Sequence, residues 1–159
     1  METVYLETTI VSYLVARPSR DLIVAGHQQL TREWWDHRRS NFDSFISQLV
    51  LDEAAAGEGE QAALRLRALH GLPLLTISPE VERLAGEFVK RVLPPSAARD
   101  AVHLAAAVAN KLDYLLTWNC AHLANAQILK RLDPVAEAAG FKLPRVCTPE
   151  ELMGMSGYE

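Results

Sequence analysis

RDAVHLAAAVANKLDYLLTWN, residues 99–119, predicts a helix followed by a strand. The helical part is rich in alanine and has the carboxylate of Asp100 near its start. The strand, Tyr114–Thr117, is apolar and runs into the polar end Thr117-Trp118-Asn119. In α/β sheets, ligands bind in the crevice beyond the carboxyl ends of the strands. The stretch therefore predicts an α/β fold with a ligand site near Asp100.

Three more apolar runs come earlier in the chain, and a helical pattern follows each of them: Val4–Leu6, Phe42–Ser47 and Leu72–Ile77. Strands that alternate with helices are typical of parallel β-α units. A late segment, Arg145–Thr148, is a candidate fifth strand. We therefore expect a central parallel sheet of four or five strands.

Periodicity and end residues predict the helices. Besides the helix that carries Asp100, helices are expected between a cap at Thr8 or Thr9 and a stop at Pro18, and over Asp21–Arg38, Gln48–Ala56, Glu60–Leu69 and Pro79–Val92. Gly57 and Gly59 are expected to separate the third helix from the fourth. Pro94 and Pro95 impose a stop before the helix with Asp100, which Ser96 is expected to cap.

The composition predicts one domain, residues 1–159, because 159 residues with 49% hydrophobic side chains suffice for a single core. The formal net charge of −4 argues against binding nucleic acid by bulk electrostatics, which needs a basic surface.

No apolar stretch approaches the roughly 18 residues of a membrane-spanning helix. Cys120 and Cys147 lack the spacing of a zinc site. We expect a cytoplasmic protein with free thiols and no membrane association.

Three acids occupy comparable places: Glu7 at the end of the first strand, Glu53 on the helix after the second, and Asp100 on the helix before the fourth. The carboxyl ends of parallel strands share one edge, so these side chains can converge there. Converging carboxylates repel each other unless a cation or a proton lies between them. Mg²⁺ prefers oxygen ligands of this kind. The pattern is therefore consistent with a magnesium site.

Each acid also has a simpler interpretation. Glu7 and Asp100 would each favour a helix N-terminus through its dipole, worth about 0.3–1 kcal/mol. Glu53 would be a solvated helix residue, like Asp52 beside it. For Glu53 taken alone, this simpler role is the favoured one.

In their order and spacing these residues resemble the PIN-domain nucleases, including the toxin nucleases of bacterial toxin–antitoxin pairs. Four elements carry the resemblance, which covers almost the whole chain: the strand–acid–threonine run Val4–Thr9, the second acid in Leu51-Asp52-Glu53, the third acid in Asp100-Ala101, and the T-x-N motif Thr117-Trp118-Asn119. The chain departs from the family at two places. Glu7 stands where the family usually has aspartate, and His122 stands where the toxin-like pattern has an acid.

The resemblance implies a three-layer α/β/α sandwich and metal-dependent hydrolysis of RNA phosphodiester bonds. The implied ligands of Mg²⁺ or Mn²⁺ are Glu7 and Asp100, with Glu53 and Asn119 acting through water or orienting the nucleophile. Implied partners are single-stranded or structured RNA, a small antitoxin and a second copy of the chain. The alternative is a catalytically degenerate PIN-like module that binds RNA or a protein, because Asn119 and His122 leave the fourth corner of the site without an acid.

Several other residues are weaker candidates. His103 lies one turn beyond Asp100 on nearly the same helix face, where a packed histidine is expected rather than a ligand. His122, beside Leu123, is expected to be a surface or capping residue of a helix, although imidazole can bind a metal or carry a proton.

Aromatic and basic residues offer further, weaker possibilities. Trp34, Trp35 and Trp118 can stack on unpaired bases, but core or interface packing is the expected role. Arg17 and Arg20 are candidates to meet phosphates at the edge of the site, whereas Arg38 and Arg39 are expected to form a solvated helix end.

Overall fold

The computed structural model describes residues 1–155 and contains a sheet of five parallel strands in the order β3-β2-β1-β4-β5. The strands are β1 (Glu2–Leu6), β2 (Phe42–Ser47), β3 (Leu74–Leu75), β4 (Tyr114–Leu116) and β5 (Arg145–Cys147). From β1 the chain builds the sheet outward through β2 and β3 on one side, and then through β4 and β5 on the other. The strand order therefore reverses between β1 and β4, which is where sheets of this kind bind ligands.

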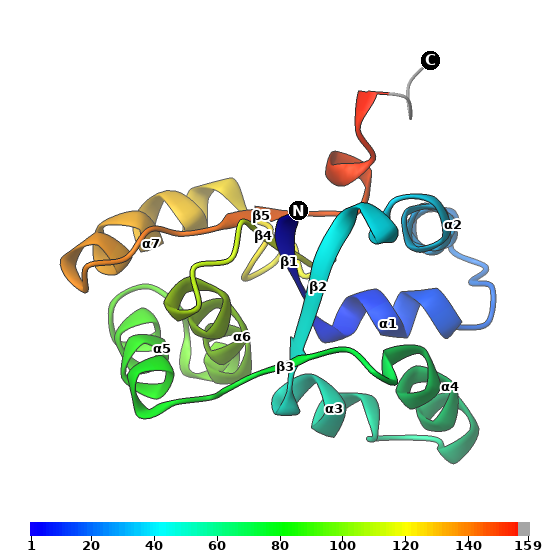
Figure 1. Cartoon of the computed structure of the whole chain (residues 1–159), viewed down its shortest axis with the longest axis horizontal. Coiled ribbons are helices and arrows are strands. Elements are labelled where there is room, and N and C mark those ends of the chain that lie inside the picture. Colours follow the sequence, from blue (N-terminus) through cyan, green and yellow to red (C-terminus); the bar gives the residue numbers. More distant parts are fainter. Residues whose placement is uncertain (156–159) are drawn as a thin grey trace.

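Seven α-helices surround the sheet in the described part of the chain. They are α1 (Thr8–Val15), α2 (Leu22–His37), α3 (Gln48–Ala54), α4 (Gly59–Leu69), α5 (Pro79–Arg91), α6 (Ala98–Ala109) and α7 (Ala126–Ala138), with short 3₁₀ turns η1 (Arg39–Asn41), η2 (Pro95–Ala97) and η3 (Glu150–Leu152). In Figure 1, α1, α2 and α4 lie on one side of β1 and β2, and α5, α6 and α7 lie on the other. The expected α/β/α sandwich with a central parallel sheet is confirmed.

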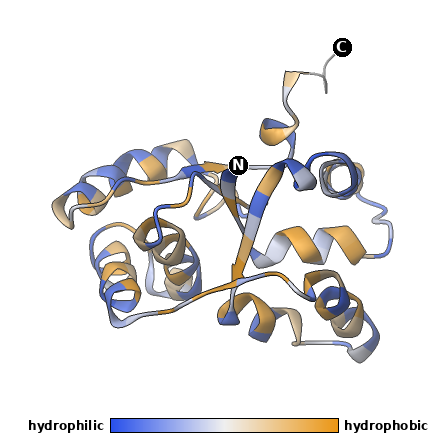
Figure 2. Cartoon of the chain, viewed as in Figure 1, coloured by the Kyte–Doolittle hydropathy of each residue, from blue (hydrophilic) through white to orange (hydrophobic). Residues whose placement is uncertain are grey.

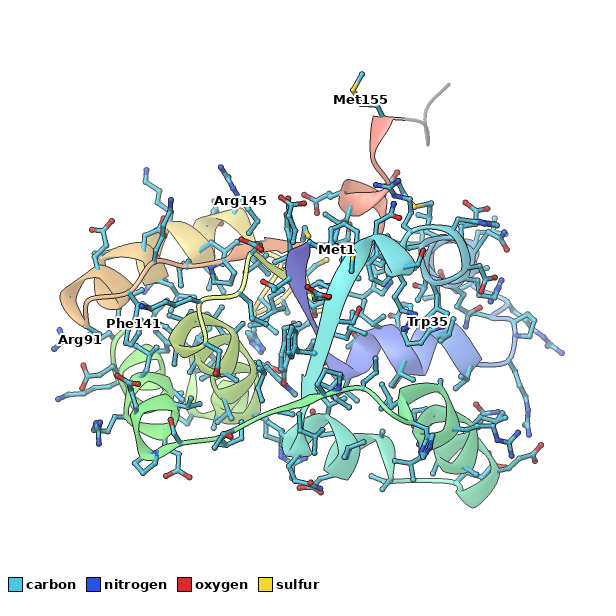
Figure 3. The ribbon with its side chains drawn as sticks, in the orientation of Figure 1. Met1, Trp35, Arg91, Phe141, Arg145 and Met155 are labelled. Carbon is cyan, nitrogen blue, oxygen red and sulfur yellow. The ribbon has the colours of Figure 1, made fainter. Side chains whose placement is uncertain are left out.

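The core lies between the sheet and the two helix groups. Val4, Tyr5 and Leu6 of β1 are at most 1% exposed, and α6 buries a continuous run from His103 to Val108. Fully burying a leucine such as Leu115 of β4 contributes about 1.5–3 kcal/mol. Figure 2 shows a hydrophobic end of β2 at the centre and helices that alternate hydrophobic and hydrophilic residues, as amphipathic helices do. Charged side chains such as Arg91 and Arg145 project from the surface (Figure 3).

Most expected elements are present, and some end earlier than expected. The strand expected over Leu72–Ile77 is reduced to the two residues of β3, and the helix expected over Gln48–Ala56 ends at Ala54. The helix expected over Asp21–Arg38 is confirmed, because Asp21 caps α2 by accepting hydrogen bonds from the N–H groups of Ile23 and Val24.

The expected helix caps at Thr8 or Thr9 and at Ser96 are wrong. Glu7 is the N-cap of α1, and its side chain accepts the N–H of Thr9. Ser96 lies within η2, where the N–H of Ala97 donates to the carbonyl of Pro94 (2.9 Å), so α6 starts from a 3₁₀ turn without a side-chain cap.

Two other differences concern helix placement. α4 starts at Gly59, which was expected to break the chain between helices. The sequence patterns did not predict α7, which Asn125 caps and which contains Pro134. Because proline lacks a backbone N–H donor and usually ends a helix, Pro134 makes the helical periodicity of this segment difficult to recognise. His122 therefore lies in a turn before α7 and not on a helix.

Both cysteines are free thiols, as expected. Burial raises the pKa of Cys147 to about 12, so this thiol stays protonated and unreactive near neutral pH. Within residues 1–155 the structure contains no helix with the length and apolar character needed to cross a membrane.

Candidate metal centre

The carboxyl ends of β1 and β4 meet at the point where the strand order reverses. The backbone N–H of Glu7, the first residue after β1, donates to the carbonyl of Leu116 at the end of β4 (3.1 Å). The N–H of Thr117 in turn donates to the carbonyl of Cys147 on β5 (2.9 Å). These bonds extend the sheet pairing by one residue. Glu7 and Thr117 are thereby held side by side at the sheet edge.

The Glu7 side chain is 5% exposed and accepts three hydrogen bonds. The hydroxyls of Thr9 (2.6 Å) and Thr117 (2.5 Å) donate to its Oε1, and the N–H of Thr9 (3.0 Å) donates to its Oε2. Burying a carboxylate costs free energy, which charged donors and cations offset more fully than neutral donors do. Two carboxylate oxygens offer about four acceptor positions. Glu7 therefore keeps acceptor capacity for a cation on Oε2.

Glu53 reaches the same edge from α3. Its Oε1 accepts the hydroxyl of Thr8 (2.7 Å) and lies 2.5 Å from Nε2 of His103. Burial acts to raise the pKa of Glu53, but the hydrogen bond and charge of His103, the Thr8 hydroxyl and the charge of Arg99 outweigh it, so the pKa is lowered. These groups therefore favour the carboxylate form, which is the form that binds metal.

A chain of buried hydrogen bonds supports Glu53 from behind. His103 is 1% exposed, its Nδ1 lies 2.7 Å from the Tyr5 hydroxyl, and that hydroxyl lies 2.8 Å from Oγ of Ser47. Burial strongly raises the pKa of Tyr5, so its hydroxyl keeps its proton. With a carboxylate as the acceptor at one end, the Nε2–H of His103 donates to Glu53, and the Tyr5 hydroxyl joins Nδ1 of His103 to Ser47.

One side-chain atom from each of Glu7, Glu53 and His103 lies within 4.8 Å of the other two, so this group could hold a metal ion. The three residues come from the end of β1, from α3 and from α6. Sequence patterns indicated both acids. His103 is buried, as expected, but it is a hydrogen-bonded member of the acidic group and not an apolar packing residue. Its position three residues after Asp100, on the same helix face, was the available indication.

The structure places Asp100 outside that group of three, beside His122. Oδ2 of Asp100 lies 3.0 Å from Nδ1 of His122, and both side chains are partly exposed. Asn119 links this pair to Glu7: its Oδ1 accepts the N–H of His122 (3.0 Å), and its own N–H donates to the hydroxyl of Thr117 (2.9 Å), which donates to Glu7. The predicted residues thus form two neighbouring clusters, and a metal-binding role for Asp100 stays a prediction.

The weaker aromatic and basic candidates have other partners. Trp34 is fully buried, and the guanidinium of Arg39 lies 4.5 Å from the Trp35 ring centre. Arg17 is within 3.8 Å of Glu58 and 3.5 Å of Glu60. The helix end at Arg38 and Arg39 is half-buried, and the Nε atoms of both arginines are buried, so the expected solvated end is wrong.

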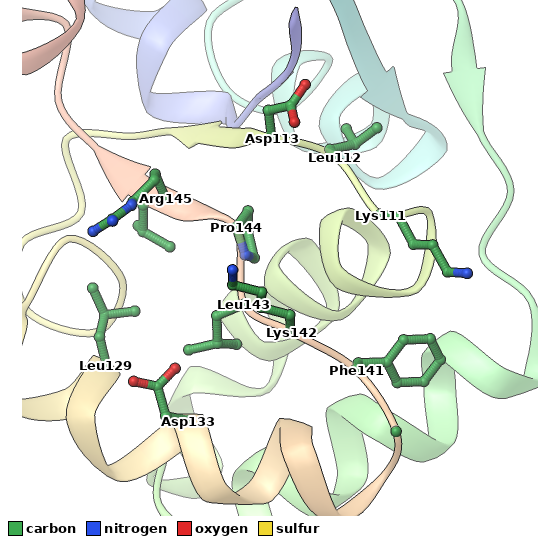
Figure 4. Close-up of a pocket in the computed structure, with 12 residues that line it drawn as sticks. Lys111, Leu112, Asp113, Leu129, Asp133, Phe141, Lys142, Leu143, Pro144 and Arg145 are labelled. Carbon is green, nitrogen blue, oxygen red and sulfur yellow. The ribbon is translucent and has the colours of Figure 1, made fainter.

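A cleft of about 780 Å³ lies away from the acids, between α7 and the amino ends of β4 and β5. Figure 4 shows Lys111, Asp113, Phe141 and Arg145 among its lining residues. Because Glu7 and Glu53 gather at the carboxyl ends of the strands, this cleft is not part of the candidate metal centre.

Comparison with models of known protein families and with curated proteins found no match to this chain. Conclusions about its function therefore rest on the geometry of the site and on the motifs in the sequence.

Proposed function

We propose that this protein is a metal-dependent endoribonuclease that uses Mg²⁺ or Mn²⁺ to hydrolyse RNA phosphodiester bonds. The observation that carries the proposal is the convergence of Glu7, Glu53 and His103, from three distant parts of the chain, at the point where the strand order reverses. The order of the acidic motifs, which resembles that of PIN-domain nucleases, supports it. A role as the toxin of a toxin–antitoxin pair and a homodimeric assembly rest on that resemblance alone.

The residues at the centre fit a hard divalent cation. Carboxylate oxygens are the preferred ligands of Mg²⁺, and Mn²⁺ accepts the same oxygens. Within residues 1–155, Oε2 of Glu53 has no hydrogen-bond partner, and Oε2 of Glu7 has one. When bound, the ion would supply a hydroxide nucleophile near neutral pH and neutralise charge on the phosphate. It would also offset the net charge of −4, which otherwise repels RNA.

In this proposal each residue of the candidate site has a defined role. Glu7 and Glu53 hold the ion, and the hydrogen bonds from threonine hydroxyls and from His103 keep both carboxylates in place. Asp100 serves as a further ligand or orients the attacking water. Asn119 accepts the N–H of His122 and so holds His122 beside Asp100. His122, in contact with Asp100, carries a proton between water and the leaving oxygen.

The test is incubation of purified protein with single-stranded RNA and Mn²⁺, beside the variants Glu7→Gln, Glu53→Gln and Asp100→Asn. Each is expected to lower the cleavage rate by more than about 100-fold, beyond the 10- to 100-fold loss typical of residues that only orient a ligand. Asp52→Asn is the matched control, because Asp52 is an exposed acid on the same helix as Glu53. Equal cleavage by wild type and all three variants would show that the site is wrongly assigned.

A second candidate function is a degenerate PIN-like module that binds RNA or a protein without cleaving it. The observation that favours it is the pairing of Asp100 with His122, which leaves only two carboxylates in the group that could hold a metal. Calorimetric titration with Mn²⁺ separates the two functions. An absence of binding at millimolar Mn²⁺ would favour the module.

A further inference from the structure

Three aromatic rings from three elements lie beside the metal centre with nearly parallel planes. The rings of Trp118 and His27 are 4.0 Å apart between centres and 11° apart in tilt. Tyr13 lies 6.1 Å from Trp118 at 17° and 6.4 Å from His27 at 22°. Tyr13 belongs to α1, His27 to α2, and Trp118 to the segment after β4. Figure 1 shows α1 and α2 on the same side of the sheet.

Trp118 fixes this stack to the metal centre. Its backbone N–H donates to the hydroxyl of Thr9 (2.9 Å), and the same hydroxyl donates to Oε1 of Glu7 (2.6 Å). Its indole N–H donates to the hydroxyl of Thr31 on α2 (2.7 Å). The preceding residue, Thr117, also donates to Glu7. A ligand on the stack would therefore lie next to a phosphate held at the acids.

Tyr13, which lies to the side of the stacked Trp118–His27 pair, and His27 are the more exposed rings of the three. Trp118 is 8% exposed, whereas Tyr13 and His27 are half-buried. Among residues 1–155, neither the Tyr13 hydroxyl nor the His27 ring nitrogens have a hydrogen-bond partner, and these atoms are not among the buried unpaired ones. Helix packing between α1 and α2 alone requires only apolar rings and does not account for the polar atoms of Tyr13 and His27. Aromatic faces with free polar ends are what proteins use to recognise unpaired bases.

We propose that Tyr13 and His27, seated on Trp118, bind one unpaired nucleobase of the RNA, next to the phosphate at the metal centre. This inference rests on the proposed ribonuclease function and adds to it a subsite for one unpaired base. A base in a duplex has both faces covered by its neighbours and cannot enter the stack. Stacking tolerates every base and adds affinity without the basic surface that this acidic chain lacks.

The test measures binding of a labelled single-stranded RNA octamer in Ca²⁺, with intact RNA verified on a gel. A series of octamers, each with one abasic nucleotide, locates the stacked base. In the wild type, one position of the series is expected to lose about tenfold in affinity, and the others little. This first measurement needs no variant and does not depend on how substitutions affect folding.

Tyr13→Ala and His27→Ala are expected to bind the unmodified octamer about tenfold more weakly and to lose the penalty at that one position. Tyr13→Phe keeps the ring and is expected to keep most of the affinity. Phe141→Ala is the control, because Phe141 is a half-buried ring in the cleft at the opposite edge of the sheet.

A titration with Mn²⁺ separates failure of this subsite from failure of the nuclease function. If the wild type binds Mn²⁺ and cleaves RNA but all abasic octamers bind alike, or if both alanine variants keep the position-specific penalty, the subsite is wrong and the nuclease stands. If the wild type binds neither Mn²⁺ nor RNA, both proposals fail.

Discussion

Nε2 of His103 lies 2.5 Å from Oε1 of Glu53, although 50 residues separate them in the chain. The contact joins α6 to α3 across the edge of the sheet and turns two side chains with unremarkable sequence contexts into one unit. The second ring nitrogen of His103, Nδ1, contacts the Tyr5 hydroxyl on the central strand β1. The position of Glu53 therefore depends on the core of the protein and not only on its own helix.

His103→Ala is expected to weaken Mn²⁺ binding by about 10- to 100-fold, because Glu53 loses the group that orients it. It is also expected to lower the free energy of unfolding by about 1–3 kcal/mol, since the buried hydroxyl of Tyr5 keeps Ser47 but loses His103, the second of its two partners. Calorimetric titration and urea unfolding measure the two effects. His37→Ala, at an exposed histidine of α2, is the control. Unchanged Mn²⁺ affinity in His103→Ala would contradict the orienting role.

Tyr5→Phe removes only the hydroxyl between Ser47 and His103 and keeps the buried ring. We expect the free energy of unfolding to fall by about 1–2 kcal/mol, because both partners of the hydroxyl lie in the protein interior. Tyr114→Phe is the matched control, since the Tyr114 hydroxyl donates to Glu2 (3.1 Å) at an exposed position. The control is expected to change unfolding by less than about 0.5 kcal/mol. Equal effects of the two substitutions in urea unfolding would argue against the buried chain.

The lowered pKa of Glu53 predicts how stability depends on pH. Because the folded-state pKa lies below the ordinary value of 4.5, the unfolded chain binds more protons than the native protein between these two values. The contribution of Glu53 to stability is therefore complete above pH 4.5 and is lost as the pH falls through the folded-state pKa. Urea unfolding from pH 3 to pH 7 should show a difference between wild type and Glu53→Gln that shrinks toward acid. A difference that grows toward acid would refute the sign.

Sequence patterns predicted the sheet, most helices and the convergence of Glu7 with Glu53, because apolar runs and helix periodicity are local properties that set the strand ends. They did not predict that Asp100 pairs with His122 or that His103 joins the acids. Both outcomes depend on the rotation of α6 and on the turn before α7, which are set by packing between distant segments. The helix α7 itself was not predicted, because Pro134 lies within it and proline usually ends a helix.

The cap of α1 was misassigned for a similar reason. Thr8 and Thr9 are good N-caps by residue type, yet the hydroxyl of Thr8 donates to Glu53 and that of Thr9 donates to Glu7. Glu7 takes the cap position instead. Threonines that serve the acids cannot be distinguished from caps until the distant acid is in place.

The last prediction concerns Thr117, whose hydroxyl donates to Oε1 of Glu7 and accepts the N–H of Asn119. Thr117→Val keeps the shape of the side chain and removes both bonds. We expect Mn²⁺ affinity to fall by about tenfold or more, because Glu7 loses one of its three donors and the Asn119 loop loses its anchor. Thr148→Val is a matched control: Thr148 is also a buried threonine directly after a strand, but its hydroxyl donates to Glu151 (3.2 Å), away from the acids. Since both substitutions bury the same methyl group, their difference in Mn²⁺ titration measures the two bonds of the Thr117 hydroxyl, and equal affinities would show that neither bond positions the Glu7 carboxylate.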